Sequence, residues 1–245
     1  MKEKDSRPLV ETLWQLSKAV RYEVNDPDNN LDKAKAHLKQ GSLLLYTNHF
    51  STLDTTVLAR FLDENLSLSN LSILAGRKHL DPQRGVSSRI KNSVIHGLAK
   101  TRGFDVLQVV QRYEAHLYQD SSNFNRVSVQ KAIEALKTKG RILAIAPEGT
   151  RSKTGGLIKA EPGIDILFRI AKDSSLALPI ALHPYQIFPP LTQTVVEVGT
   201  PYSYEEISME KVLYPDKSII NLMMGRLAVL LPKENRGYYA KSVTS

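Results

Sequence analysis

The sequence reads LLLYTNHFSTLD from Leu43 to Asp54, and this stretch decides the fold that we predict. Its apolar first part is typical of a buried strand, and the polar turn that follows carries His49. Ser51 or Thr52 is then suited to cap a helix that includes Asp54. The stretch therefore predicts a histidine at the carboxyl end of a strand, followed by a carboxylate at the start of a helix.

The chain continues this alternation of strands and helices. Apolar runs predict strands at residues 42–47, 71–75, 106–110, 142–146, 176–182 and 195–198. Helical spacing predicts helices at residues 7–24, 31–40, 52–62, 87–99, 127–139, 164–171 and 217–231. This pattern indicates an α/β fold, with a mostly parallel central sheet flanked by helices on both faces and an N-terminal helical appendage. In such sheets ligands bind outside the carboxyl ends of the strands.

The composition limits the chemistry that is available. Hydrophobic residues make up 42% of the 245 residues, so a sizeable core is expected. The chain has no cysteine, which excludes disulfides, thiolate catalysis and cysteine-bound metals. A net charge of +8 favours acidic partners, although a merely basic soluble protein also fits. Aromatic residues make up 7%, which argues against a stacking surface, so we expect no nucleic-acid partner.

The two ends of the chain indicate how the protein would contact lipid. Residues 7–24 predict an amphipathic helix with Trp14 and a cationic end, which fits either a membrane interface or packing on its own domain. No secretory signal is visible near the start. The apolar segment 219–231 contains Arg226 and is shorter than the ~18–20 residues of a spanning helix. We therefore expect any contact with lipid to be made from the surface.

Two roles are open for His49 and Asp54. A neutral imidazole accepts a proton at neutral pH, and Asp54 is able to hold one ring nitrogen and stabilise the imidazolium that forms. Alternatively, residues 51–54 form a capping box, in which Asp54 only binds an N-cap amide. Because the chain has no Gly-x-Ser-x-Gly motif, a histidine–carboxylate pair would activate a substrate hydroxyl directly.

A second polar cluster, PEGTRS at residues 147–152, follows the apolar run 142–146. We expect it to face the same cleft as His49, because both clusters follow the carboxyl ends of predicted strands. There Glu148 is able to bind the hydroxyls of a polyol, and Arg151 is suited to a phosphate. The alternative is a charged surface turn with an Arg–Glu contact.

The two clusters carry a resemblance to a known family. Asn48-His49, with four residues before Asp54, matches an N-H-x4-D motif, and residues 147–152 match a P-E-G-T-R-S motif. In this order and spacing, the motifs resemble those of the glycerol-3-phosphate and lysophosphatidate acyltransferase family, with its phospholipid/glycerol acyltransferase domain.

Other blocks extend the resemblance over roughly residues 42–200. Residues 76–80 resemble the family's K-x-E-L-like segment, and residues 178–180 resemble its fourth block. Residues 102–106 have the glycine of the second block but lack its proline, and Arg112 lies further along than in the family. A basic stretch from Arg77 to Arg112 lies between the two motifs. It suits the phosphate, the CoA, an acidic carrier protein or anionic lipid headgroups, and the alternative is a solvated helix face.

The resemblance implies transfer of an acyl group from acyl-CoA or acyl-carrier protein to the hydroxyl of 1-acylglycerol-3-phosphate or glycerol 3-phosphate, in phospholipid biosynthesis. His49 is then the general base and Asp54 its partner. The substrate-binding residues that we expect are Glu148, Gly149, Thr150, Arg151, Lys78 and Arg102. No cofactor and no metal are expected.

The expected organisation has three parts. Residues 1–40 form an N-terminal helical segment and possible membrane-surface anchor, residues 41–231 the acyltransferase domain, and residues 232–245 a C-terminal tail. We expect a cytoplasmic protein, peripheral on the inner membrane face, where it meets an anionic membrane surface. The rival interpretations are a thioester hydrolase that uses the same His–Asp pair and a non-catalytic, basic membrane-surface protein.

Overall fold

A computed structural model of the chain describes residues 12, 14–15, 20–51, 54–81, 83, 85–183, 186–188 and 191–243. These residues form an eight-stranded sheet with the order β1-β8-β6-β2-β5-β3-β4, and β7 pairs with β8 outside this path. The strands are β1 (Arg21–Asn25), β2 (Ser42–Thr47), β3 (Leu71–Gly76), β4 (Asp105–Val109), β5 (Ile142–Ile145), β6 (Ser175–Leu182), β7 (Gln186–Phe188) and β8 (Leu191–Val198). The predicted α/β fold with a mostly parallel sheet is confirmed.

Five of the strands end at the same edge of the sheet. Strand β2 pairs in parallel with β5 and β6, β5 pairs in parallel with β3, and β3 pairs in parallel with β4. Strand β8 runs antiparallel to β6, and β1 runs parallel to β8. We call the edge at which β6, β2, β5, β3 and β4 end the carboxyl edge. Because β2 is the middle strand of the seven-strand path, between β6 and β5, the turn that follows it is central in the sheet.

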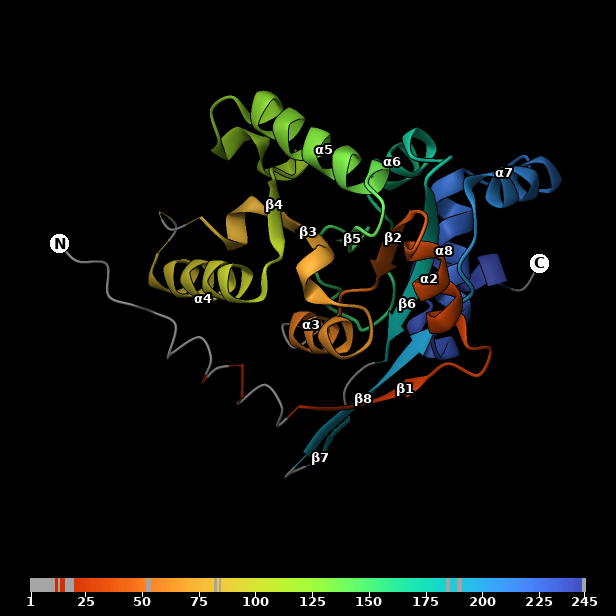
Figure 1. Ribbon diagram of the computed structural model, residues 1–245, viewed down its shortest axis with the longest axis horizontal. Coiled ribbons are helices and arrows are strands. Elements are labelled where there is room, and N and C mark those ends of the chain that lie inside the picture. The colour runs from red at the N-terminus through yellow and green to blue at the C-terminus, as the bar shows by residue number, and fades with distance from the viewer. Residues whose placement is uncertain are drawn as a thin grey trace.

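Helices cover both faces of the sheet (Figure 1). On one face lie α2 (Asn30–Leu38), α3 (Asp54–Asn65) and α4 (Val86–Arg102). On the other lie α5 (Ser121–Lys137), α6 (Ile164–Ile170), α7 (Tyr204–Leu213) and α8 (Ile219–Val229). Strand β2 serves both cores, because successive side chains of a strand point to opposite faces: Leu43 and Leu45 pack on one side, and Leu44 and Tyr46 on the other.

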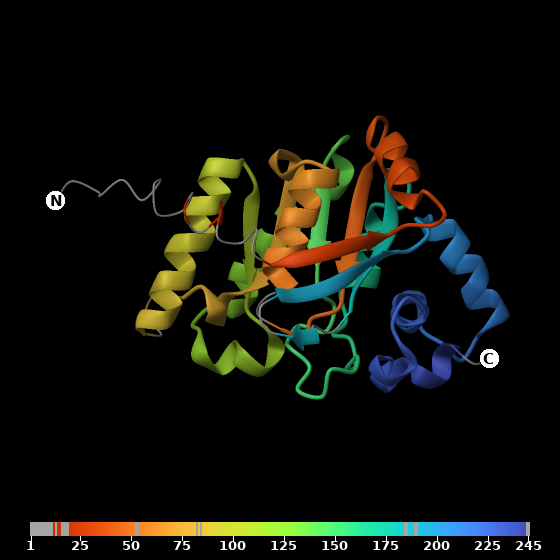
Figure 2. The same ribbon diagram turned by 90° about the horizontal axis from the view of Figure 1, so that it is seen from below.

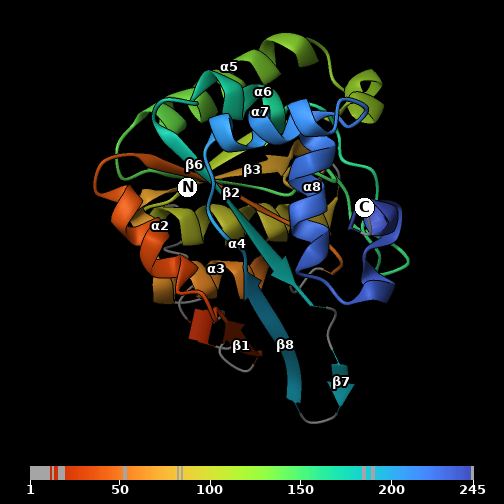
Figure 3. The same ribbon diagram turned by 90° about the vertical axis from the view of Figure 1, so that its right-hand side faces the viewer.

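The structure corrects several predicted elements. The helix predicted at residues 7–24 is wrong in its last turn, because Arg21–Asn25 form β1; Thr12, Trp14 and Gln15 are helical, and the rest of residues 7–19 lies outside the described residues. Strand β8 is longer than predicted, and β7 and α7 were not predicted. Figure 3 shows β7 and β8 reaching beyond the layered core. In the part of the chain that is described, no helix has the length and apolarity needed to cross a bilayer.

The residues that we predicted as a C-terminal tail are largely folded. Two 3-10 helices, η5 (Lys233–Asn235) and η6 (Gly237–Val243), follow α8, and η6 packs against it. The side chain of Tyr239 is buried, and its hydroxyl accepts a hydrogen bond of 2.9 Å from the backbone amide of Ala160. This contact joins the end of the chain to the loop that follows β5.

We predict that Tyr239→Ala lowers the free energy of unfolding by about 3–5 kcal/mol, because it empties a buried aromatic site. The neighbouring Tyr238 is 57% exposed and is the matched control. Its ring is edge-on to Tyr239, so Tyr238→Ala is expected to cost less than about 1 kcal/mol. Urea unfolding followed by circular dichroism measures both values, and equal losses would contradict the packing described.

Candidate active site

The two polar clusters of the sequence meet at the carboxyl edge. The loop after β2 carries His49, and the loop after β5 carries Glu148. The backbone amide of His49 donates a hydrogen bond of 2.9 Å to Oε1 of Glu148, and the carbonyl of His49 accepts one of 3.0 Å from the amide of Ser152. Figure 2 shows the loops of this edge gathered at one end of the sheet. The predicted proximity of the two motifs is therefore observed.

Asp54 binds backbone amides of the turn before α3 and is also a partner of His49. Its Oδ2 atom lies 3.1 Å from Nδ1 of His49, and it accepts hydrogen bonds of 2.5 and 2.7 Å from the amides of Phe50 and Ser51. The carboxylate is almost fully buried at the first residue of α3, where the helix dipole favours negative charge. A proton on Nδ1 satisfies this contact and leaves Nε2 as the acceptor. The two roles left open by the sequence are thus compatible.

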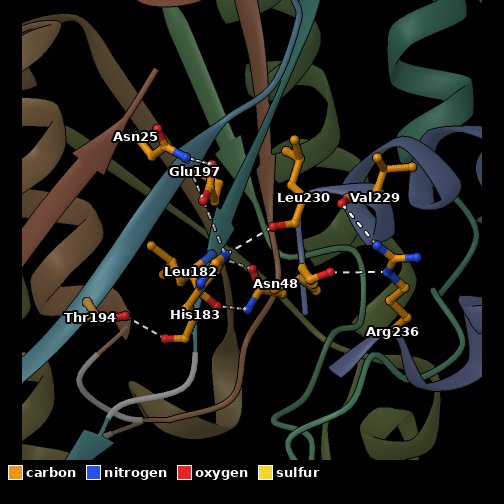
Figure 4. Close-up of polar contacts among 10 residues, drawn as sticks. Asn25, Asn48, Leu182, His183, Thr194, Glu197, Val229, Leu230 and Arg236 are labelled. Atoms are coloured by element: carbon orange, nitrogen blue, oxygen red, sulfur yellow. Dashed lines mark hydrogen bonds and ion pairs between the residues drawn. The ribbon is translucent and has the colours of Figure 1, made fainter. Parts of the chain in front are cut away.

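Asn48 joins this turn to the neighbouring strand. Its Nδ2 donates to the carbonyl of Leu182, and its Oδ1 accepts from the amide of Leu182, both at 2.8 Å (Figure 4). The side chain is buried, and it continues the pairing of β2 with β6 for one more step. Asn48 therefore fixes the end of β2 and, with it, the start of the turn that carries His49.

His183 continues the polar network on the far side of Asn48. Its Nε2 lies 3.0 Å from the carbonyl oxygen of Leu230, at the end of α8, and 3.7 Å from Oε1 of Glu197 on β8. Glu197 in turn accepts two hydrogen bonds from Nδ2 of Asn25 on β1, as Figure 4 shows. Sequence reasoning gave His183 no role. In the structure it joins the end of β6 to β8 and α8.

Glu148 is held by backbone amides. In addition to the contact with His49, its Oε2 accepts a hydrogen bond of 2.8 Å from the amide of Ile158, and the residue is 2% exposed. Burial raises the pKa of Glu148 to about 7, although the two amide hydrogen bonds and the charge of His49 oppose this. We expected Glu148 to bind substrate hydroxyls. In the structure its oxygens join the turn after β2 to the loop after β5.

The loop after β5 is also held at its far end. Nδ2 of Asn235 donates to the carbonyl of Gly155 at 2.7 Å, and the carbonyl of Asn235 accepts from the amide of Leu157 at 2.9 Å. Within this loop Gly149 has a φ of +66°, a conformation that favours glycine. Thr150 follows it half-buried, and Arg151 is exposed. Among the described residues, the guanidinium of Arg151 has no hydrogen-bond or ion-pair partner, so its donors are available to a ligand.

Lys78 reaches the same loop through a chain of contacts. Its ammonium lies 2.6 Å from Oε1 of Glu114, which is 2% exposed, and it hydrogen-bonds the hydroxyl of Tyr113. Burial lowers the pKa of Lys78, but the hydrogen bonds to Glu114 and Tyr113 outweigh this and raise it above its usual value. Tyr113 contacts Gln111, and Nε2 of Gln111 donates to the carbonyl of Gly149. Sequence reasoning missed Gln111 and Glu114, although Gln111 directly follows a predicted strand.

Arg102 is not part of this site. It is the last residue of α4, which precedes β4, so it lies at the opposite edge of the sheet from His49. Its Nη1 is 3.7 Å from Oδ2 of Asp63, and its guanidinium lies 4.9 Å from the ring centre of Trp14. Gly103 has a φ of +76° and caps α4, so this glycine serves the helix end and does not turn Arg102 toward the carboxyl edge.

The fold and these contacts define an α/β protein with a histidine–carboxylate pair at the carboxyl edge of its sheet. Across the described part of the chain, no three histidine or carboxylate groups are placed to bind a metal ion. The Acyltransferase family matches residues 23–187. The chain belongs to the acyltransferase family.

The structural comparison is weaker than the family match. The fold is similar to the crystal structure of the 1-acyl-sn-glycerophosphate (LPA) acyltransferase PlsC from Thermotoga maritima, with a TM-score of 0.47 and 13% sequence identity. The similarity covers 84% of this chain and 74% of that chain. No curated protein matches the sequence.

The raised pKa of Glu148 predicts a pH dependence of stability. The pKa is about 7 in the folded protein and 4.5 for a free side chain, so the folded state binds more protons between these values. The free energy of unfolding is therefore expected to fall as the pH rises from about 4.5 to 7, by up to about 3 kcal/mol. Glu148→Gln should lack this part of the slope. Urea unfolding across this range measures it, with the exposed Glu161→Gln as control; an unchanged slope in Glu148→Gln would refute the assignment.

Proposed function

We propose that this protein is an O-acyltransferase that moves a fatty acyl group from acyl-CoA or acyl-carrier protein to a glycerol-phosphate acceptor, 1-acylglycerol-3-phosphate or glycerol 3-phosphate, in phospholipid biosynthesis. The observation that carries the proposal is the contact of 3.1 Å between Nδ1 of His49 and Oδ2 of Asp54 at the carboxyl edge. The membership of the acyltransferase family supports the reaction class. The reaction requires no cofactor, because the thioester of the donor is already activated.

The proposed reaction is direct transfer between the two substrates. Nε2 of His49 takes the proton of the acceptor hydroxyl while its oxygen attacks the thioester carbonyl. Asp54 stabilises the imidazolium that forms. The carbon–sulfur bond then breaks, the new ester is released, and His49 returns the proton to the leaving thiolate. No side-chain nucleophile is needed, which agrees with the absence of a Gly-x-Ser-x-Gly motif from the sequence.

The neighbouring residues have separate roles in this proposal. Arg151 binds the acceptor phosphate, since its exposed guanidinium presents paired donors beside Gly149 and Thr150. Glu148 is a positioning residue, because both of its oxygens hold backbone amides. Lys78 supports the backbone of Gly149 through Tyr113 and Gln111.

We further propose that the carboxyl edge faces an anionic membrane surface, on the cytoplasmic side of the inner membrane. Arg112, Arg151, Lys153 and Lys159 are exposed on the two loops of this edge. Tyr113 and Leu117 are also large exposed side chains there, at 47% and 46% exposure. Cations interleaved with exposed aromatic and aliphatic groups suit contact with anionic headgroups.

We predict that His49→Ala lowers kcat/KM for acyl transfer by roughly 10²–10⁴-fold, because the general base is removed. Asp54→Asn should also reduce turnover, since it leaves a neutral partner for the imidazolium. His116→Ala, an exposed histidine in the loop after β4, is the matched control and should retain activity. Purified protein is incubated with acyl-CoA, with and without each acceptor, and the product ester is quantified.

The same assay separates the rival functions. Release of free fatty acid with or without an acceptor would indicate a hydrolase, and the absence of any turnover would favour a binding protein. Full turnover by a folded His49→Ala variant would overturn the proposed mechanism. Circular dichroism of each variant checks that the fold is retained.

Membrane contact is tested with charge reversal on the loop after β5. The double substitution Lys153→Glu and Lys159→Glu is expected to weaken binding to phosphatidylglycerol-containing vesicles by roughly tenfold or more, because each cation near an anionic surface contributes about 1 kcal/mol. Lys137→Glu with Lys139→Glu, at the opposite edge, is the control. Vesicle sedimentation at low and high salt measures the binding. Equal losses in both pairs would contradict a specific membrane-facing edge.

A further inference from the structure

A cavity of about 510 Å³ lies beside the edge strand β4, apart from His49 and Asp54. Side chains of β4, of α5 and of the residues before α5 line it, together with Arg77, which follows β3. Its volume is within the range of sites that hold small molecules. Several of its lining side chains come from one face of α5: Asn123, Phe124, Val127, Ser128 and Lys131.

Arg77 is held in a defined orientation at this cavity. Its guanidinium lies 4.2 Å from the ring centre of Phe124 and 4.7 Å from that of Tyr118. Aromatic contacts of this kind are made by the faces of a guanidinium, whereas its N–H donors point outward in the plane. Within the described residues, those donors have no hydrogen-bond or ion-pair acceptor. A guanidinium fixed by two rings and lacking an acceptor is suited to an anionic ligand.

The remaining lining groups suit a ligand larger than a single phosphate. Lys131 supplies a second cation, and Asp120 supplies the one carboxylate among the lining residues. One oxygen of Asp120 accepts a hydrogen bond of 3.1 Å from Asn123, and the other is available to a hydroxyl group. Val127 is 48% exposed and gives the cavity an apolar surface. Phosphates, hydroxyls and a planar base are the groups that this combination recognises.

We propose that this cavity binds the adenosine phosphate end of a coenzyme A thioester, with Arg77 and Lys131 at its phosphates. The base lies against Phe124 and Val127, and Asp120 accepts a ribose hydroxyl. This assignment rests on the proposed function, because it identifies the donor as a coenzyme A ester rather than an acyl-carrier protein, which has no nucleotide.

The location of the cavity fits the path of a thioester arm. Strands β3 and β2 are two positions apart in the sheet, so Arg77 and His49 follow strand ends that lie about 10 Å apart. Lys78, next to Arg77, is connected through Tyr113 and Gln111 to Gly149, which adjoins the Glu148 contact to His49. The pantetheine arm is an extended chain that is long enough to cross this part of the carboxyl edge.

The test compares donors that share the thioester but differ at the far end. Steady-state kinetics are measured with acyl-CoA, acyl-3′-dephospho-CoA and S-acyl-pantetheine. Arg77→Ala and Lys131→Ala are expected to raise KM for acyl-CoA roughly tenfold or more, the loss of a charge-assisted hydrogen bond. Turnover of S-acyl-pantetheine and KM for the acceptor should be unchanged. Lys137→Ala removes a cation from the same helix outside the cavity and should leave every constant unchanged.

Other results would overturn the assignment. A raised KM for the acceptor alone would mean that the cavity serves the acceptor phosphate. Equal losses with acyl-CoA and S-acyl-pantetheine would indicate a structural role, and unchanged constants would leave the cavity without a function in the reaction. Transfer from acyl-carrier protein but not from acyl-CoA would also refute it.

A direct binding measurement tests the cavity assignment independently of the proposed acyltransferase function. Calorimetry of the full chain with adenosine 3′,5′-bisphosphate requires no turnover. Binding that weakens in Arg77→Ala supports the cavity even if no acyl transfer is found. Acyl transfer from coenzyme A donors without bisphosphate binding would refute the cavity and leave the proposed function standing.

Discussion

The buried carboxylate of Glu148 is the interaction on which the candidate site depends. One oxygen binds the amide of His49 and the other binds the amide of Ile158, so a single side chain joins two loops that are distant in sequence. A carboxylate at 2% exposure is costly to bury, and hydrogen bonds to a charged group offset this by about 1.5–3 kcal/mol each. Glu148 therefore fixes the position of His49 through its backbone amide, and this role requires no contact between Glu148 and a substrate. Asp54 and Asn48 complete the turn in the same way, by replacing backbone partners with side-chain atoms.

The central strands were predictable because their apolar sequence alone indicates buried strands. Strands β2, β5 and β6 are buried on both faces, so they appear as continuous apolar runs. Strand β1 is mostly exposed, and it exists because β8 supplies its backbone partners, which no local pattern reveals. Helix α7 did have a readable start, since Ser203 and Glu206 form a capping box.

The site was predictable in its motifs but not in the direction of each side chain. His49 and Glu148 each come directly after a predicted parallel strand, so the order of elements along the sequence is enough to place both at one edge of the sheet. The sequence does not show that two amides converge on Glu148, because Ile158 reaches it only through the course of the loop. Arg102 is a different case, because it was predicted to bind substrate but lies at the opposite edge of the sheet from His49. Its neighbour Gly103 was interpreted as part of a binding block, whereas the glycine ends a helix at the far edge.

The contacts of Asn235 and Tyr239 with the loop after β5 have a consequence for the order of folding. They join residues that are 80 and 79 positions apart, with β6, β8, α7 and α8 between them. During synthesis the loop that carries Arg151 therefore leaves the ribosome well before the residues that support it. A nascent chain ending before Asn235 would already contain His49, Asp54 and Glu148, yet its loop would lack two of its supports. Acyl transfer by this fold is then a property acquired late in synthesis, after the sheet itself is complete.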